Sequence, residues 1–180
     1  LGVEAARILD GKGQEIKEGR LKKPFLMVAS FLNPHDICLE GSTGLSPVVE
    51  DKGGRKQVIT ECVREMRARA AAIDSVEFYK KHAPGLPSNF DKTAGFPDMK
   101  RAPYKEFPEY YWRKYRWTYG QLVSLVDSHI GHIVDALDRH PELKKNTIVV
   151  FTSDHGEMQG AHQLVTKGMP YDECQRVPFI

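Results

Sequence analysis

A short apolar run followed by a polar break constrains the fold of this chain more than any other feature. Residues 147–152 (TIVVFT) are mainly β-branched or aromatic, which is typical of a strand buried on both faces. The run ends at Ser153-Asp154-His155-Gly156, so an acid, an imidazole and a glycine follow the strand directly. Open α/β sheets bind their ligands beyond the carboxyl ends of the strands. We therefore expect a functional site at residues 153–156.

A second segment repeats this pattern. Residues 24–32 (PFLMVASFL) predict another buried strand, and they are followed by Asn33-Pro34-His35-Asp36. A third apolar segment, residues 177–180, predicts a further strand. If the first two strands are neighbours in a parallel sheet, both polar breaks lie on the same edge of it.

The intervening segments predict helices that flank this sheet. Apolar residues recur at helical spacing over 55–81 and, more strongly, over 108–139. Residues 1–9 are interpreted as the end of a helix, and residues 10–23, rich in Gly and Lys, as a solvated connection. Residues 82–107 form a long loop rich in Pro, Gly and Asn, and such loops are usually functional or pack over another part of the domain. The expected fold class is α/β, with a mainly parallel sheet flanked by helices.

Composition and charge exclude several classes of protein. The 180 residues suffice for one domain with a sizeable core, and a net charge of +2 predicts binding neither to nucleic acid nor to an anionic membrane. No apolar run approaches the length of about 20 residues that a membrane-spanning helix needs. The three cysteines are far apart and form no CxxC pair, which disfavours a structural zinc site or a disulfide framework. No signal peptide is visible, and the sequence predicts no compartment.

Five residues are candidates for chemistry. Asp154 and His155 could together ligate a hard divalent ion such as calcium or magnesium, although an Asp-capped turn is the alternative. Lys167 offers a point charge for a tetrahedral anion, or is a surface lysine. His35 could hydrogen-bond an oxyanion or protonate a leaving oxygen, or it could be a turn histidine. His162 is a weaker candidate of the same kind.

Taken together, these segments resemble the sulfatase family of the alkaline-phosphatase-like superfamily. The resemblance lies in FLMVASFLNPHD, YGQLVSLVDSHIGHIVDAL, TIVVFTSDHGEMQGAH and TKGMPYDECQRVPFI, which occur in the family's order. The blocks cover most of the chain, and residues 41–107 match least. The part most specific for this family is the series of motifs SDHG, K-G-x-P-Y and R-V-P, in that order.

The resemblance implies a role for each candidate. Asp154 and His155 match a pair of metal ligands, and the metal in the family is usually calcium or magnesium. Lys167 and His35 match residues that contact the sulfate group, and His35 is also a candidate proton donor to the leaving oxygen. His162 lies in a loop that approaches the site and is a further substrate-binding candidate. The implied substrate is a small-molecule or glycan sulfate ester, and the implied nucleophile is a formylglycine diol that the metal helps to hold.

The chain also departs from the family pattern. No Cys or Ser is followed by x-Pro/Ala-x-Arg, the family's nucleophile segment. The acidic pair near the family's N-terminus is also absent, as is the Lys-x-His segment that lies between the nucleophile and the strand matched here by residues 24–32. We therefore expect the central-to-C-terminal part of one sulfatase catalytic domain, with residues 82–107 as a loop insertion and about half of the active site. The remaining parts of the same domain would then be its partners, and the isolated chain is predicted to be inactive. A phosphonate monoester or phosphodiester hydrolase and a non-catalytic binding homologue are the alternatives.

Overall fold

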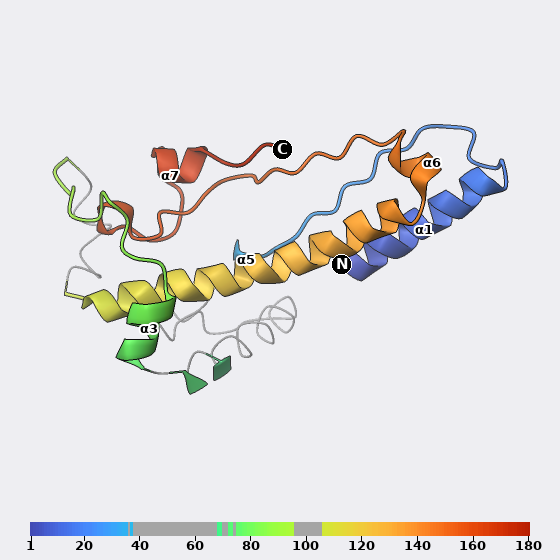
Figure 1. The fold of residues 1–180 in the computed structure, drawn as a ribbon. Coiled ribbons are helices and arrows are strands. Elements are labelled where there is room, and N and C mark those ends of the chain that lie inside the picture. Colours follow the sequence, from blue (N-terminus) through green and yellow to red (C-terminus); the bar gives the residue numbers. More distant parts are fainter. Residues whose placement is uncertain (36, 38–67, 70–71, 74, 96–105) are drawn as a thin grey trace, which may run out of the picture. The chain divides into compact units, whose positions relative to one another are not determined.

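The computed structural model describes residues 1–35, 37, 68–69, 72–73, 75–95 and 106–180. The chain divides into two compact units, the first made of Leu1–Asn33 and Val123–Val150, and the second of Pro34–Leu122 and Phe151–Ile180. In chain order the helices are α1 (Gly2–Lys17), α3 (Val76–His82), α5 (Glu109–Asp138), α6 (Pro141–Lys144), η2 (Ala161–Gln163) and α7 (Asp172–Gln175) (Figure 1). None of the helices in these ranges has the length and apolar character needed to cross a membrane.

The long helix α5 confirms the strongest prediction of secondary structure. It extends over 30 residues, within one residue of the predicted range at each end. Pro108 precedes its first turn, where the missing N–H of proline would have no helical partner, and its carbonyl accepts from Tyr111 N at 3.0 Å. The first part of α5 belongs to the second unit and the last part to the first unit.

Helix α1 is longer than predicted. The predicted solvated connection over residues 10–23 is wrong as far as Lys17, because the helix continues through Gly11 and Gly13. Glycine inside a helix costs about 0.5–1 kcal/mol relative to alanine. At Gly13 a close approach requires it, since a Cβ there would lie 2.2 Å from Cγ of His140.

The core of the first unit joins α1 to the last part of α5 and to α6, and α1 lies beside α5 (Figure 1). Its buried residues are Ala6, Leu9, Ala136, Leu137 and Leu143. At the edge of this core Asp10 accepts hydrogen bonds from Arg139 at 2.8 and 3.3 Å, and its Oδ1 lies 2.9 Å from Nε2 of His140. The Arg139 and His140 side chains hold the pKa of Asp10 below its ordinary value.

The predicted strands are not formed by the described residues, and this part of the fold prediction is wrong for the structure. Residues 24–32 and 147–151 are extended but carry no ladder, and Leu26 and Ile148 are 90% and 91% exposed. An isolated antiparallel bridge joins Thr152 to Phe179. A buried strand requires hydrogen-bonded neighbours on both sides and cover on both faces. Apolar β-branched composition alone cannot supply those neighbours.

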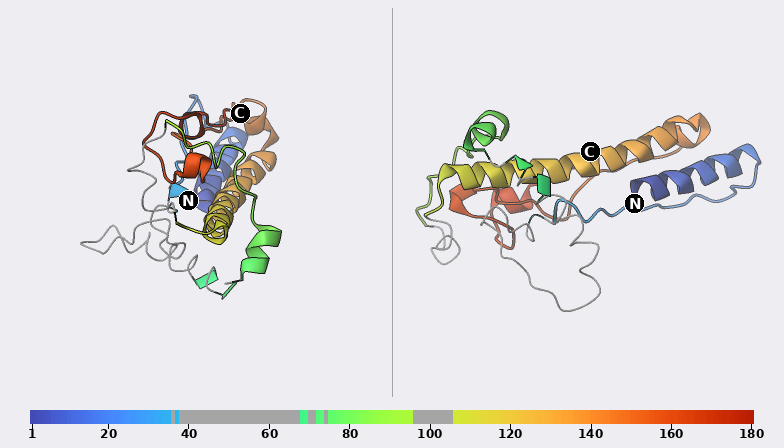
Figure 2. Two further views of the ribbon diagram at one scale, coloured as in Figure 1. Left: turned by 90° about the vertical axis from the view of Figure 1, so that its left-hand side faces the viewer. Right: turned by 90° about the horizontal axis from the view of Figure 1, so that it is seen from below.

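The second unit has a core of aromatic side chains. Trp112, Tyr115 and Leu122 on α5 are buried together with Ile37 and Val165. The aromatic side chains of α5 in this cluster therefore serve packing. A second buried cluster lies in the segment that holds η2 and α7. It consists of Met158, Ala161, Leu164 and Cys174. The segment that holds η2 and α7 lies along the first part of α5 (Figure 2).

Most of the helix predicted over 55–81 falls outside the described residues. Where the structure does describe it, the chain is not one continuous helix, because Ser75 is extended (φ −137°, ψ 121°). The Ser75 side chain accepts from Phe78 N at 3.2 Å and caps α3.

Candidate functional site

The segment 153–156 holds the two candidate metal ligands in a tight turn. The Ser153 hydroxyl donates to His155 O at 2.8 Å, and His155 N donates to Asp154 Oδ1 at 3.0 Å. His155 Nδ1 lies 2.8 Å from Gly156 O. Because a carbonyl oxygen only accepts, Nδ1 carries the proton and Nε2 presents its lone pair. The Asp154 side chain is 86% exposed, and its Oδ2 lies 3.7 Å from His155 Nε2.

The chemistry and arrangement of these two donors fit a divalent ion as part of a ligand set. Metal-binding histidines commonly donate their other ring N–H to a backbone carbonyl, as His155 does to Gly156. A carboxylate oxygen suits calcium or magnesium, and those ions take about six ligands or more. Within the described ranges, no cluster of three or more His, Cys, Asp or Glu side chains could hold a metal ion. Asp154 and His155 therefore provide two ligands at most.

Gly156 permits the closest backbone approach at this site. Its N–H donates to Cys174 O at 2.7 Å, and a Cβ at this position would lie 2.0 Å from Glu173 O. Any other residue would push the turn away from α7. The glycine of the SDHG motif is thus required by packing.

Residues 157–168 form a compact loop with a strained backbone. Met158 N donates to Thr166 O at 3.0 Å, and Gly160 N donates to Leu164 O at 2.9 Å. Positive φ angles occur at four residues that are not glycine: Gln159, His162, Gln163 and Thr166. Each such residue costs on the order of 1 kcal/mol or more, so tertiary contacts must hold the loop in this path.

A buried pair lies directly after the predicted metal ligands. Glu157 is 8% exposed, and its Oε1 accepts from the hydroxyl of the fully buried Tyr115 at 2.8 Å. Burial raises the pKa of Glu157, while the Tyr115 hydrogen bond and the charge of Lys167 act in the opposite direction. Burial, reinforced by the Glu157 charge, raises the pKa of Tyr115 well above its ordinary value. The sequence reasoning missed this pair, and its available signal was an acidic residue directly after Asp-His-Gly.

The structure brings two of the predicted residues together. Lys167 Nζ lies 2.8 Å from His35 Nδ1, although 132 positions separate them in the chain. Lysine only donates, so His35 Nδ1 accepts and the neutral ring carries its proton on Nε2. Ile37, two positions after His35, and Val165, two positions before Lys167, are buried in one apolar cluster. That cluster accounts for the meeting of the two side chains.

His162 lies in different surroundings. Its Nδ1 lies 2.5 Å from Lys92 O, and its Nε2 lies 3.0 Å from Nδ2 of Asn89. Asn89 also donates to Glu173 Oε1 at 2.6 Å. The sequence reasoning did not single out Asn89 or Glu173. It did interpret the long loop that contains Asn89 as functional or packed over another part of the domain.

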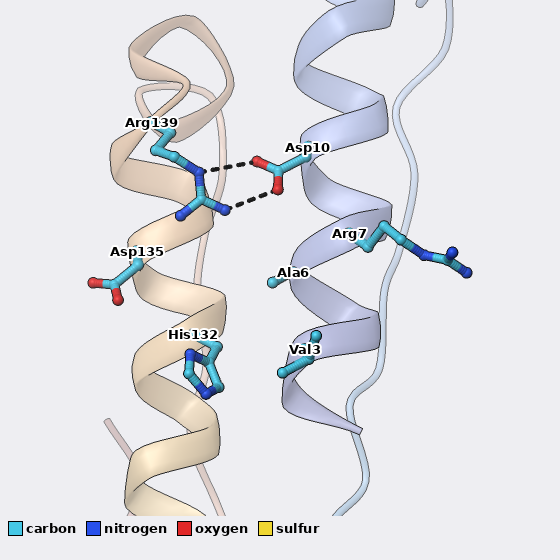
Figure 3. A pocket seen from close by; sticks show the side chains of 7 residues that line it. All are labelled: Val3, Ala6, Arg7, Asp10, His132, Asp135 and Arg139. Carbon is cyan, nitrogen blue, oxygen red and sulfur yellow. Dashed lines mark hydrogen bonds and ion pairs between the residues drawn. The ribbon is translucent and has the colours of Figure 1, made fainter.

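A hollow of about 340 Å³ lies within the first unit, between α1 and the last part of α5 (Figure 3). None of the site residues predicted from sequence lines it. Its most prominent polar contact is the ion pair of Asp10 with Arg139, and the Arg7 side chain points away from it (Figure 3). The lining residues are Val3, Ala6, Arg7, Asp10, His132, Asp135 and Arg139.

Comparison with known proteins decides the family. The model of the family described as Sulfatase matches residues 2–180, almost the whole chain. This chain belongs to the sulfatase family. The family prediction made from the sequence blocks is confirmed.

The chain is also similar in sequence to individual sulfatases, over part of the length of each. The chain is 29% identical to a Delta 4,5-hexuronate-2-O-sulfatase of Bacteroides thetaiotaomicron in an alignment of 171 positions, which covers 88% of this chain and 30% of that protein. It is 42% identical to the Iduronate 2-sulfatase of Mus musculus over 78 residues, 43% of this chain and 14% of that protein. The chain therefore spans less than a third of these relatives.

Solved sulfatase structures share the fold of this chain. A crystal structure of a proposed sulfatase from Bacteroides thetaiotaomicron superposes with a TM-score of 0.64 at 25% identity, covering 99% of this chain and 34% of that one. A 2-O GAG sulfatase superposes with a TM-score of 0.63 at 24% identity, with the same coverage. The predicted likeness to a portion of the sulfatase fold is thus confirmed, whereas the predicted parallel sheet is not formed by the described residues.

Proposed function

We propose that this chain forms part of the catalytic domain of a sulfuric ester hydrolase and supplies the residues that bind the sulfate group. The observation that carries the proposal is the contact of Lys167 with His35 at 2.8 Å. A lysine amine beside an imidazole suits a tetrahedral anion, because both can donate hydrogen bonds to its oxygens. Family membership supports a sulfate ester as that anion.

The two residues have complementary roles in this proposal. The Lys167 ammonium group neutralises charge on the sulfate oxygens. The Lys167 contact keeps Nδ1 of His35 as an acceptor, so the proton on Nε2 is the one that the ring can donate to the leaving oxygen. His35 is held for this role by the turn in which Ile37 N donates to Pro34 O at 3.1 Å.

Asp154 and His155 would hold one divalent metal ion, calcium or magnesium, together with ligands from the rest of the domain. A bound ion would polarise the sulfate group as a Lewis acid. The His155 contact with Gly156 O keeps the imidazole in the tautomer that can ligate metal. A formylglycine nucleophile would come from another part of the catalytic domain, because no Cys or Ser of this chain has the family's nucleophile pattern.

The test is sulfate ester hydrolysis by the complete protein and by its Lys167→Ala and His35→Ala variants. Because two relatives are named for the 2-O-sulfates of uronic acids, such glycans are tested beside a simple aryl sulfate and a phosphonate monoester. We expect each variant to lose about a hundredfold or more in kcat/KM. Lys22→Ala, at an exposed lysine of the first unit, is the control and should retain activity.

Activity of the 180-residue chain alone provides a second check. We expect it to hydrolyse no aryl sulfate, because it holds only part of the site. Turnover by this chain, or hydrolysis of the phosphonate in preference to every sulfate ester, would contradict the proposal.

A further inference from the structure

Three polar side chains from distant parts of the second unit form one hydrogen-bonded cluster. Asn89 belongs to the loop that follows α3, His162 to η2, and Glu173 to α7. Asn89 Nδ2 contacts His162 Nε2 at 3.0 Å and Glu173 Oε1 at 2.6 Å. His162 and Glu173 side chains are only 14% and 28% exposed. We call these three residues the Asn89 cluster.

The hydrogen-bond chemistry of the cluster allows one consistent assignment of protons. Lys92 O can only accept, so the 2.5 Å contact places a proton on His162 Nδ1. Nε2 of the neutral ring then accepts one amide hydrogen of Asn89, and the second hydrogen goes to Glu173. Both ring nitrogens of His162 are therefore engaged by protein groups.

The backbone of His162 adds independent evidence of a constraint. Its φ and ψ angles are 55° and 26°, in the left-handed region, where glycine and asparagine are the usual residues. His162 N also donates to Asn89 O at 3.2 Å, so Asn89 forms hydrogen bonds with both the ring and the main chain of His162. The next residue, Phe90, packs edge-on against Trp112 with ring centroids 5.1 Å apart. The loop around Asn89 is thus anchored in the aromatic core.

We propose that the Asn89 cluster holds the strained loop 157–168 in place and thereby sets the position of Lys167. His162 is a positioning residue in this scheme, rather than the substrate contact predicted from sequence. The loop transmits the constraint through the hydrogen bond of Met158 N to Thr166 O, next to Lys167. The part that concerns Lys167 rests on the proposed function, whereas the constraint on the loop does not.

Hydrogen–deuterium exchange of the complete protein tests the constraint without any assay of activity. Asn89→Ala and His162→Gly should each accelerate amide exchange across residues 157–168 by about tenfold or more, because each removes hydrogen bonds of a partly buried network. The glycine variant adopts the left-handed backbone without strain, so faster exchange in it cannot be due to added strain at this position. Asn146→Ala, which removes an asparagine that donates to Glu142 O in the first unit, should leave this loop unchanged.

Nitrogen NMR of the histidine rings tests the assignment of protons. His162 should show a protonated Nδ1 and an unprotonated Nε2 near neutral pH, and addition of inorganic sulfate should leave that pattern unchanged. A proton on Nε2, or a direct response of the His162 ring to sulfate, would overturn the positioning role. Unchanged exchange in both Asn89→Ala and His162→Gly would overturn the cluster as the constraint.

A double-mutant cycle tests the link to Lys167. We expect Asn89→Ala to lower kcat/KM for a sulfate ester by about tenfold, because small displacements of a catalytic group are costly. In a Lys167→Ala background the same change should cost almost nothing further. An equal loss in both backgrounds would show that Asn89 acts through another group. If the parent protein hydrolyses no sulfate ester, the proposed function fails while the exchange result still decides the constraint.

Discussion

The two units of this chain use different means to hold their structure. In the first unit, α1, α6 and the last part of α5 meet through small and aliphatic side chains, with Gly2 and Gly13 at the points of closest approach. In the second unit, loops are held by buried polar contacts, such as Tyr115 with Glu157, and by the Asn89 cluster. Helix pairs tolerate small adjustments, whereas a strained loop depends on individual hydrogen bonds. The candidate site lies in the second kind of structure.

The largest effect is expected at Gly156 in the second unit. Gly156→Ala places a methyl group 2.0 Å from the backbone oxygen of Glu173, and backbone cannot move aside cheaply. We expect the free energy of unfolding to fall by about 3 kcal/mol. Urea unfolding measures this change. Gly85→Ala, at an exposed glycine with no heavy atom within 4 Å of the added Cβ, should be close to neutral. Equal losses of unfolding free energy in the two variants would contradict the close approach of Gly156 to the backbone of Glu173.

A somewhat smaller effect is expected at Gly13 in the first unit. A methyl group there would meet the ring of His140 at 2.2 Å, but a side chain can shift in part. We expect a loss of about 2 kcal/mol in the free energy of unfolding. Gly11→Ala is the matched control on the same helix, where the added Cβ meets nothing within 4 Å. It should raise stability by up to about 1 kcal/mol, since alanine favours the helix. Loss of stability in the control would count against this account.

Removal of the Tyr115 hydroxyl tests the buried pair of the second unit. Tyr115→Phe keeps the ring but leaves the Glu157 carboxyl without its 2.8 Å donor. We expect a loss of about 1.5 kcal/mol in thermal or urea unfolding. Tyr119→Phe is the control, because the Tyr119 hydroxyl forms no hydrogen bond with the described residues. A similar loss in both variants would show that the pair contributes little.

The smallest effect is expected for the exposed ion pair of the first unit. The hydrogen bond from Arg139, followed by that from His140, holds the pKa of Asp10 below its ordinary value of 3.8. A depressed pKa in the folded state contributes stability above the unfolded value and loses it as the pH falls through the folded value. Asp10→Asn should therefore be slightly less stable than the parent at neutral pH. In urea titrations the difference should shrink as the pH falls below 3.8 and vanish below the depressed pKa of the folded state. A difference that persists in acid would point to packing instead.

Helix α1 shows where sequence reasoning reached its limit for local structure. Its second half was interpreted as a solvated connection because Gly11 and Gly13 lower helix propensity. The helix persists because Leu9 is buried and Gly13 lets the chain approach His140. The packing that stabilises the second half of α1 involves His140, which is 127 positions from Gly13. A local sequence pattern cannot reveal such a contact.

The prediction of strands is wrong for the described residues for a related reason. Residues 24–32 and 147–152 have the composition of buried strands, and composition reflects the surroundings that a segment requires. Whether those surroundings exist depends on neighbouring strands, which the described residues do not provide. The solved sulfatases match this chain over only 34% of their own length. Assignment of α/β class from these runs was therefore an inference about more structure than the described residues contain.

By itself the sequence predicted the long helix α5 and the family, and both predictions are confirmed. It also named the residues of the sulfate and metal site that we propose. These features depend on local periodicity or on short motifs. Only the tertiary structure decided that Lys167 meets His35, that Glu157 is buried against Tyr115, and that His162 is bound to Asn89. The physical reason is that each of these contacts joins residues at least 42 positions apart. Hydrogen-bond partners at such separations are chosen by packing and not by sequence pattern.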